Sequence, residues 1–349
     1  MFQIIKENTN NYKLNKLKQI FVVGSSRSGT TMMGRILGNN SEVFTFRELH
    51  FFGTLWTQAS NQELTKNEQI ELLSKLFSIQ KNGLFNQVDY SRFNSKSEKI
   101  LTRVIKSPLE VYELFLDTIV KENSTQISCE QTPKNLYYLD EIMRFFPNAK
   151  VVNLVRDQRD VLLSQKNKWK RRFLGAKSIP FFEAIRSYIN YHPILTAKVW
   201  NSSLLYTSKY FNDSNVKIVK FEDLLTNPKD IISDICDFLE INFQDEMLNI
   251  PLVGSSTEKD DRSELKIDLS KINKWKKGGL SNGEIYLSQK FSSKMMDKFG
   301  YERKAFSCPP VSSLLYFFSF PIKLGLAFLF NIHRIGNIAE VIKKRFFIK

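Results

Sequence analysis

The fold of this chain is decided by the stretch Val22-Val23-Gly24-Ser25-Ser26-Arg27-Ser28-Gly29-Thr30-Thr31. The apolar residues 20–23 predict a short buried strand, and the apolar side chains within 30–37 predict the first turns of a helix. Between them, a turn of small residues can point its backbone N–H groups at one place, which the positive end of the helix dipole also faces. We therefore predict an anion-binding loop here; the alternative is a strand-to-helix turn without a ligand.

The spacing from Gly24 to Gly29 is that of a nucleotide P-loop, but Thr30 stands where a nucleoside triphosphatase has its lysine. A triphosphate needs that lysine and a magnesium ion because its phosphoryl groups carry several negative charges. Here the cation is Arg27, which comes earlier in the loop. A phosphate–sulfate anhydride carries less charge, so backbone amides, hydroxyls and one or two cations suffice for it. A P-loop kinase is thus disfavoured.

The segment 24–31 resembles the 5′-phosphosulfate loop of sulfotransferases that use 3′-phosphoadenosine 5′-phosphosulfate (PAPS). The resemblance implies a P-loop-NTPase-like, three-layer α/β/α fold with a central, mostly parallel sheet. It also implies that PAPS is the sulfuryl donor, that no metal is required, and that the donor is bound by Arg27, Ser28, Gly29, Thr30 and Thr31. In this family Arg27 would have a second, catalytic role at the departing phosphate.

A second motif follows the apolar run 150–155, which predicts another buried strand. Arg156 comes directly after it, at the edge where parallel sheets bind ligands, and Ser164 lies about two helical turns further on. Taken alone, an ion pair of Arg156 with Asp157 or Asp160 is the simpler reading. The resemblance reverses that order, because sulfotransferases hold the 3′-phosphate of the donor with an arginine and a serine at this spacing.

Sulfuryl transfer to a hydroxyl needs a base near the acceptor oxygen. The resemblance to the protein-tyrosine branch of the family places Glu48 in this role, with His50 as the second candidate. A capping or salt-bridging carboxylate is the alternative for Glu48.

That branch usually has a lysine where this chain has Gln131, so Arg27, Lys134 or Lys106 must supply the missing charge. Further on, residues 273–279 resemble the lid that similar enzymes fold over the nucleotide. Lys274 is the predicted phosphate contact of this lid.

Short apolar runs alternate with longer helical patterns along the chain, which predicts a parallel sheet covered by helices on both faces. Strands are expected near 20–23, 42–46, 126–129, 150–155 and 216–220. Helices are expected over 63–77, 109–120, 136–146, 157–170, 180–210, 228–239 and 284–299, with loops over 80–99 and 242–273. We divide the chain into a polar lead-in (1–17), one sulfotransferase domain (18–306) and a C-terminal tail (307–349).

The formal net charge is +15, which suits an anionic partner such as a nucleotide, an acidic glycan or a membrane surface. Nucleic acid is not the expected partner, because no zinc-finger, helix-turn-helix or RNP-like pattern occurs. Three scattered cysteines give no disulfide framework and no four-ligand metal site. A reducing, cytoplasmic location is the simplest expectation.

The tail is apolar over 311–332 and basic beyond it. The uncharged run 305–322 contains Pro309, Pro310 and Pro321, so we expect a poor membrane-spanning helix. Two readings remain open: an interfacial helix on an anionic membrane, or an extension packed on the core.

The sequence therefore predicts a PAPS-dependent sulfotransferase whose acceptor is a hydroxyl of a carbohydrate or glycolipid. A protein tyrosine is the alternative acceptor, and a non-catalytic module that binds nucleotide or membrane is the alternative class. The acceptor pocket is expected from the stretches 51–87 and 173–191.

Overall fold

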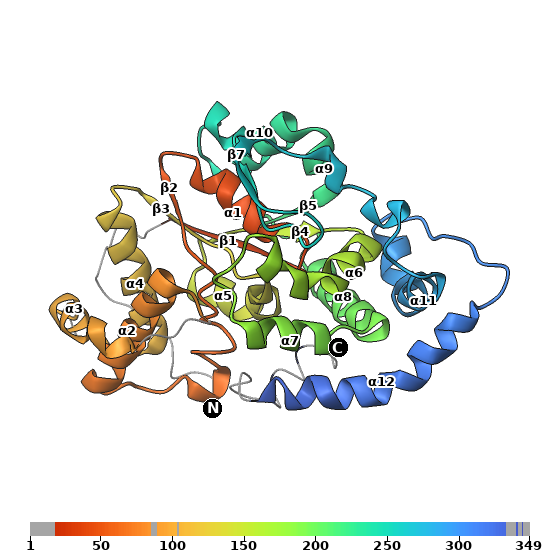
Figure 1. The fold of residues 1–349 in the computed structure, drawn as a ribbon. Helices are drawn as coiled ribbons and strands as arrows, with labels where there is room; N and C mark the ends of the chain where they lie inside the picture. The colour runs from red at the N-terminus through yellow and green to blue at the C-terminus, as the bar shows by residue number, and fades with distance from the viewer. Residues whose placement is uncertain (1–17, 85–88, 103–104, 333–339, 341–343, 345–349) are drawn as a thin grey trace.

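A five-stranded sheet organises the chain (Figure 1). The structure is a computed structural model that describes residues 18–84, 89–102, 105–332, 340 and 344. All neighbouring strands are parallel, in the order β2-β3-β1-β4-β5. The strands are β1 (Lys18–Gly24), β2 (Val43–Thr45), β3 (Ile127–Glu130), β4 (Lys150–Val155) and β5 (Val216–Lys220). The predicted central parallel sheet is confirmed, and each expected strand is present.

The central strand β1 is buried on both faces because its apolar side chains alternate between two cores. Phe21 and Val23 belong to one core, whereas Ile20 and Val22 belong to the other. Gly24 of β1 pairs with Leu154 of β4. The two strands therefore end side by side, and the loops that follow them meet at one edge of the sheet.

Helices cover both faces of the sheet and form the predicted outer layers (Figure 1). The core that contains Phe21 is closed by α2 (Lys66–Asn82), α3 (Asn94–Ile100), α4 (Pro108–Glu122) and α5 (Leu139–Phe145). The opposite core is closed by α1 (Thr30–Gly38), α9 (Phe221–Thr226) and α10 (Pro228–Leu239). A third cluster joins α6 (Gln158–Lys166), α8 (Pro193–Ser208) and α11 (Asn282–Lys298) beside the end of β4.

The remaining elements lie around this frame. They are α7 (Phe181–Ile189), α12 (Val311–Leu329), the antiparallel pair β6 (Pro251–Leu252) and β7 (Asp261–Leu265), and the 3₁₀ helices η1 (Gln58–Ser60), η2 (Tyr90–Phe93), η3 (Pro133–Tyr138), η4 (Lys168–Leu174), η5 (Asp245–Leu248), η6 (Leu269–Lys271) and η7 (Lys274–Lys277).

Several boundaries differ from the sequence prediction. Helix α2 begins at Lys66 rather than at residue 63, because Thr65 and Glu68 form a reciprocal capping box. The expected loop 80–99 contains the short helix α3, and the expected long helix 180–210 is two helices, since Pro193 starts a new one. The expected irregular stretch 242–273 contains the β6–β7 hairpin. The lead-in 1–17 and part of the tail (333–339, 341–343 and 345–349) lie outside the described residues.

Candidate active site

The loop between β1 and α1 requires glycine at both ends. Gly24 has φ 150°, and a Cβ there would lie 2.4 Å from the carbonyl oxygen of Leu154. Gly29 has φ 96°, and a Cβ there would lie 2.5 Å from the ring of Phe221. Any side chain would therefore push the loop away from β4 and α9. The two glycines let the loop sit tightly on the carboxyl edge of the sheet, with Gly29 as the N-cap of α1.

The polar side chains that follow Arg27 are largely buried at the N-terminus of α1. Ser28 is fully buried, and its hydroxyl oxygen has no hydrogen-bond partner. Thr30 is also buried, and Thr31 is half-buried. A buried hydroxyl without a partner costs free energy unless a ligand pairs with it. This arrangement suits an anion whose oxygens face the helix N-terminus.

Arg27 and Ser164 are brought together, although 137 positions separate them in the sequence. The Nε of Arg27 donates to Ser164 Oγ at 2.9 Å, and its Nη2 donates to the carbonyl oxygen of Gly254 at 2.8 Å. Ser164 Oγ also lies 3.0 Å from Ser256 Oγ. The sequence predicted that Ser164 would share a phosphate with Arg156; its direct partner in the structure is instead Arg27.

Arg156 lies under the same loop. Its Nη1 donates to the carbonyl oxygen of Arg27 at 3.2 Å, and its Nη2 donates to that of Lys271 at 2.8 Å. The guanidinium stacks 4.2 Å from the centre of the Phe221 ring, and its buried Nε has no partner. Arg156 thus connects the first loop to the segment that follows β7.

The alternative reading is an ion pair of Arg156 with Asp157 or Asp160. Both aspartates have other direct partners. Asp157 pairs with Arg159 at 2.6 Å. Asp160 accepts a hydrogen bond from the backbone N–H of Trp275 at 2.9 Å. Their charges act against the burial that lowers the pKa of Arg156, but its guanidinium donates to the backbone carbonyls of Arg27 and Lys271.

Residues 253–260, which join β6 to β7, lie against the loop between β1 and α1. Besides Gly254 and Ser256, this segment contributes Glu258, whose carboxylate forms ion pairs with both Lys271 and Lys274. Lys274 also donates to Thr257 Oγ1 at 2.7 Å. Lys274, the predicted lid residue, therefore lies beside the residues that are predicted to bind the 3′-phosphate. Its partner in this structure is the carboxylate of Glu258.

Glu48 and His50 lie together on the segment that follows β2, with Glu48 Oε2 3.3 Å from His50 Nε2. Buried hydrogen bonds hold this segment. Glu130 Oε1 accepts the N–H of Leu49 at 3.1 Å, and Thr132 Oγ1 accepts the N–H of His50 at 3.2 Å. The two base candidates, Glu48 and His50, thus form a hydrogen-bonded pair on a segment that Glu130 and Thr132 hold in place.

A comparison with protein families identifies the family of this chain. The model described as "Sulfotransferase family" matches residues 19–245, which is more than half of the chain. The chain belongs to the sulfotransferase family. This confirms the resemblance deduced from the loop, and it removes the kinase alternative.

Solved sulfotransferase structures share this fold. The chain is 20% identical to the sulfotransferase domain from the curacin biosynthetic pathway, with a TM-score of 0.51 over 82% of this chain and 99% of that domain. The sulfotransferase domain from the Synechococcus PCC 7002 olefin synthase gives 18% identity and a TM-score of 0.50, over 84% and 99% of the two chains. At these identities the likeness concerns the fold.

The curated relatives match this chain over only part of their own length. An uncharacterized protein of Aquifex aeolicus (strain VF5) is 26% identical over 66% of this chain and 26% of its own length. A Caenorhabditis elegans protein with the name "Putative protein-tyrosine sulfotransferase" is 26% identical over 42% of this chain and 54% of its own. The chain thus matches about a quarter and about half of the length of these relatives.

Burial depresses the pKa values of several cations at this sulfotransferase site. Burial lowers the pKa of Arg27 to about 9, helped by the charges of Arg171 and Arg156. Burial also lowers the pKa of Arg156 and Lys274, and it lowers that of Lys271 to about 8. A bound anion would favour the charged forms of these buried groups.

Lys168, at the start of η4, is a site residue that the sequence reasoning missed. Burial, with the charges of Arg27 and Arg186, lowers its pKa to about 8, while Glu48 acts in the opposite direction. Burial raises the pKa of Glu48, but the hydrogen bond and charge of His50 and the charges of Lys168 and Arg27 outweigh it, so the net shift is downward. The run Lys168-Trp169-Lys170-Arg171-Arg172, at the end of the predicted helix 157–170, was the signal available.

The residue that replaces the family's lysine has a packing role. Gln131 is buried; its Nε2 donates to the carbonyl oxygen of Phe46 at 3.1 Å, and its Oε1 lies where a side chain on Gly34 would be. Of the suggested substitutes, Lys106 is exposed and pairs with Glu63 at 3.5 Å, and Lys134 is exposed. Lys168 and Arg27 are the cations whose charges lower the pKa of Glu48 together with His50.

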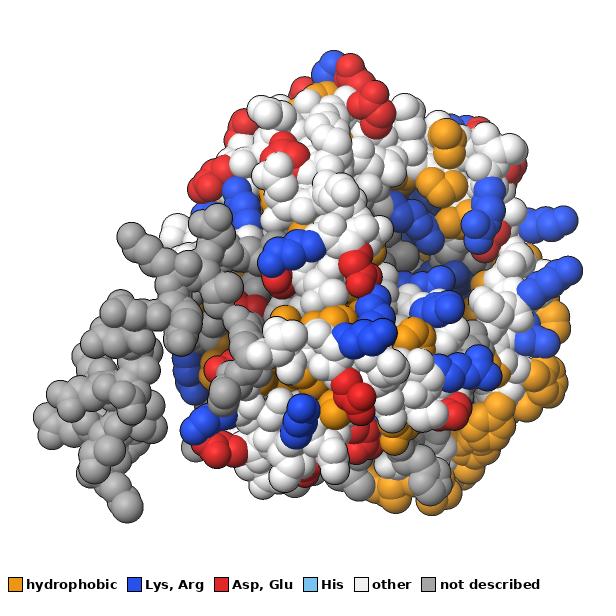
Figure 2. All heavy atoms as spheres, turned by 90° about the vertical axis from the view of Figure 1, so that its left-hand side faces the viewer, with side chains coloured by type: hydrophobic (Ala, Val, Ile, Leu, Met, Phe, Trp, Pro, Cys, Tyr) orange, Lys and Arg blue, Asp and Glu red, His pale blue; other side chains and the backbone are white. Residues whose placement is uncertain are grey.

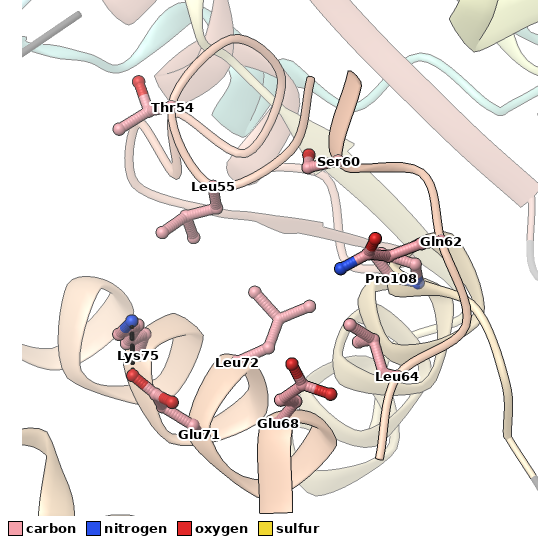
Figure 3. A pocket seen from close by; sticks show the side chains of 10 residues that line it. All are labelled: Thr54, Leu55, Ser60, Gln62, Leu64, Glu68, Glu71, Leu72, Lys75 and Pro108. Atoms are coloured by element: carbon pink, nitrogen blue, oxygen red, sulfur yellow. Dashed lines mark ion pairs between the residues drawn. The ribbon is translucent and has the colours of Figure 1, made fainter. Parts of the chain in front are cut away.

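A cavity of about 250 Å³ opens elsewhere, between the segment 54–64 and helix α2 (Figure 3). Its lining includes Leu55, Leu72 and the ion pair Lys75–Glu71, and none of the predicted site residues. Within the expected acceptor stretch 51–87, Phe51, Phe52 and Trp56 are buried in the core, and residues 85–88 lie outside the described part. The stretch 173–191, which contains α7, contacts the η4 segment that contains Lys168.

Proposed function

We propose that this sulfotransferase transfers the sulfuryl group of PAPS to a hydroxyl of a carbohydrate or glycolipid. The observation that carries the proposal is the convergence of Arg27, Ser164 and Arg156 at the N-terminus of α1. Ser28 Oγ and Arg156 Nε, in the same group of residues, are buried polar atoms without hydrogen-bond partners. These groups fit a nucleotide with one phosphate at each end.

The donor would be held in two places. The loop N–H groups of 28–31, with the hydroxyls of Ser28, Thr30 and Thr31, would bind the 5′-phosphosulfate. Arg156, Ser164 and Lys274 would bind the 3′-phosphate, and Lys274 would exchange its partner Glu258 for that phosphate.

In the reaction, the acceptor oxygen attacks the sulfur in line with the departing phosphate. A new S–O bond forms, the S–O bond to the 5′-phosphate breaks, and the bridging oxygen leaves with adenosine 3′,5′-bisphosphate. Glu48 takes the hydroxyl proton, since its depressed pKa keeps it ionised at neutral pH. Arg27 and Lys168 stabilise the negative charge that develops on the leaving phosphate.

Lys168 would supply the positive charge of the lysine that the family usually has at position 131, where this chain has Gln131. It is close enough to Arg27 and Glu48 for each to affect its pKa. Its charge would therefore act on both the base and the leaving-group cation.

A sugar acceptor is favoured because the side chains grouped around Glu48 are polar or charged: His50, Lys168 and Arg27. Such groups can hydrogen-bond the hydroxyls that flank a reacting sugar hydroxyl. A tyrosyl acceptor is the second candidate, supported by the C. elegans relative and its name.

Transfer from ³⁵S-labelled PAPS tests the proposal. The protein is incubated with free sugars, glycolipids and tyrosyl peptides, with EDTA in one series and magnesium in another. We expect label on a sugar-bearing acceptor at equal rates in both series. Label on tyrosyl peptides alone would show that the acceptor is a protein tyrosine and not a sugar. Binding of the donor with no transfer to any acceptor would contradict the proposal.

A further inference from the structure

Helix α12 presents a continuous apolar stripe to solvent. Leu315, Phe318 and Ile322 are 75%, 73% and 68% exposed, and Val311 and Leu329 extend the stripe at the same helical spacing. Among the described residues, this helix is the one long and apolar enough to cross a membrane, with a mean hydropathy of 1.5. Only 11% of its most apolar window is buried. Most of the apolar side of this helix therefore does not pack on the core.

The side of α12 that faces the protein is held by polar contacts. Ser312 Oγ accepts the N–H of Gly283 at 3.1 Å, near the start of the helix. In its middle, His192 Nε2 donates to the carbonyl oxygen of Tyr316 at 2.9 Å. Just after its end, Asn331 Oδ1 accepts from Arg186 Nη1 at 2.6 Å. A surface helix in water does the opposite and turns its apolar side inward.

The apolar surface continues from α12 onto α7 and η4. Phe182 of α7 stacks with Phe330 at 5.8 Å, and the side chains of Phe181 and Tyr188 are mostly exposed. Phe173 of η4 is exposed beside them, and it packs on Trp169. Figure 2 shows hydrophobic side chains gathered along the lower edge of the molecule, where α12 runs in Figure 1. Contiguous exposed apolar surface of this kind marks an interaction site.

The charge around this surface is positive. Neither residues 168–182 nor residues 303–332 contain an aspartate or glutamate. Lys170 and Lys177 are exposed on the first segment. On α12, Lys323 Nζ lies 5.3 Å from the centre of the Tyr188 ring. An apolar stripe flanked by lysines and free of acidic residues complements a surface of apolar chains under anionic headgroups.

We propose that α7 and α12 form a docking face for an anionic phospholipid bilayer, with α12 lying flat in the headgroup region. A flat orientation agrees with the polar contacts at the start, middle and end of α12, which a spanning helix would have to break. It also agrees with Pro321 inside the helix, which removes one backbone hydrogen bond.

This docking would bring the active site close to the membrane. Helix η4 contributes Phe173 to the apolar surface and Lys168 to the group around Glu48. The docking face goes beyond the proposed function and does not depend on it, because a protein with another acceptor could dock in the same way.

Flotation with vesicles tests the face. The full-length protein is mixed with phosphatidylcholine vesicles and with vesicles that contain 30% phosphatidylglycerol, each at low and high salt. We expect it to float mainly with the anionic vesicles. The variant L315S/F318S/I322S is expected to bind them at least tenfold more weakly. K170A/K177A is expected to bind more weakly and to lose part of the salt dependence.

The control is Leu265→Ser, which removes an exposed leucine from β7, at the opposite end of the molecule in Figure 1. Thermal melting and binding of adenosine 3′,5′-bisphosphate report whether each variant is folded. Equal flotation of the wild type and the folded triple variant would overturn the proposal. So would a wild type that binds the bisphosphate yet ignores anionic vesicles. A wild-type dimer that the triple substitution dissociates, without vesicle binding, would assign the face to a second copy of the chain.

Discussion

The guanidinium of Arg156 donates a hydrogen bond to the backbone carbonyl of Arg27 at 3.2 Å. The contact joins the loop after β1 to the residue that follows β4, across 129 positions of sequence. A single bound nucleotide can therefore contact both arginines. The side chain of Arg27 in turn reaches Ser164, so the two predicted phosphate motifs form one group of residues.

Replacement of Arg156 by alanine tests the 3′-phosphate assignment. A hydrogen bond to a charged group contributes about 1.5–3 kcal/mol, so affinity for adenosine 3′,5′-bisphosphate should fall about 10- to 150-fold. Binding of 5′-AMP, which lacks the 3′-phosphate, should change little. Calorimetric titration of both nucleotides measures the difference, with Arg156→Lys as the control that keeps the charge. Equal losses for the two nucleotides would place Arg156 elsewhere.

Replacement of Glu48 by glutamine should remove the base while its shape is kept. General-base catalysis contributes about 10²–10⁴-fold, so we expect kcat to fall by that factor. Affinity for adenosine 3′,5′-bisphosphate should be unchanged or slightly higher, since a negative charge is lost near Arg27. His50→Gln serves as the comparison. If Glu48→Gln keeps its activity and His50→Gln loses it, the histidine is the base.

The parts of the fold that the sequence predicts are those with an apolar signal. The strands β1 and β4 are continuous apolar runs, and the arginines Arg27 and Arg156 follow them at positions that a parallel sheet brings together. Hydrophobic periodicity and strand ends thus suffice to place Arg27 and Arg156 at one edge of the sheet, whereas the predicted phosphate role of Arg156 depends on the family resemblance.

The rest of the site has no such signal. The strand β7 is exposed along its whole length, so neither it nor the contact of Glu258 with Lys274 could be read from apolar periodicity. The effect of Lys168 on the pKa of Glu48 depends on the placement of η4 relative to the segment after β2, which the sequence pattern does not encode. The orientation of α12 depends on contacts with α8, α7 and α11 that no local pattern encodes.

The depressed pKa of Lys168 predicts a pH dependence. Its charge is lost as the pH rises through about 8, more than two units below the range of an ordinary lysine. Donor affinity and kcat should therefore fall above pH 8, and the bound donor should move the midpoint upward. In Lys168→Met both quantities should be low already at pH 7, and the further decline near pH 8 should be smaller than in the wild type, although Lys271 and Arg27 still lose charge. Lys170→Met, on the exposed neighbour, should keep the wild-type profile.

Glu130 should link stability to pH through the turn that holds Glu48. Burial raises its pKa to about 7, against the effect of hydrogen bonds from Thr132 and Leu49. A carboxyl whose folded pKa is raised stabilises the protein below its unfolded pKa of about 4.3, and this contribution is lost as the pH rises through about 7. Melting temperatures of the wild type should show this decline, and Glu130→Gln should lack it. A parallel decline in both proteins would contradict the assignment.

Glu258 should compete with the donor. Its carboxylate pairs with Lys271 and Lys274, the lysines beside Arg156, so a 3′-phosphate must displace it. In Glu258→Gln that competition is weaker. Because a partly exposed ion pair is worth up to about 1 kcal/mol, adenosine 3′,5′-bisphosphate should bind about fivefold more tightly. Glu264→Gln, on β7 and paired with the exposed Lys266, is the control and should bind like the wild type. Weaker binding by Glu258→Gln would mean that this carboxylate holds the lid segment in place for the nucleotide instead of competing with it.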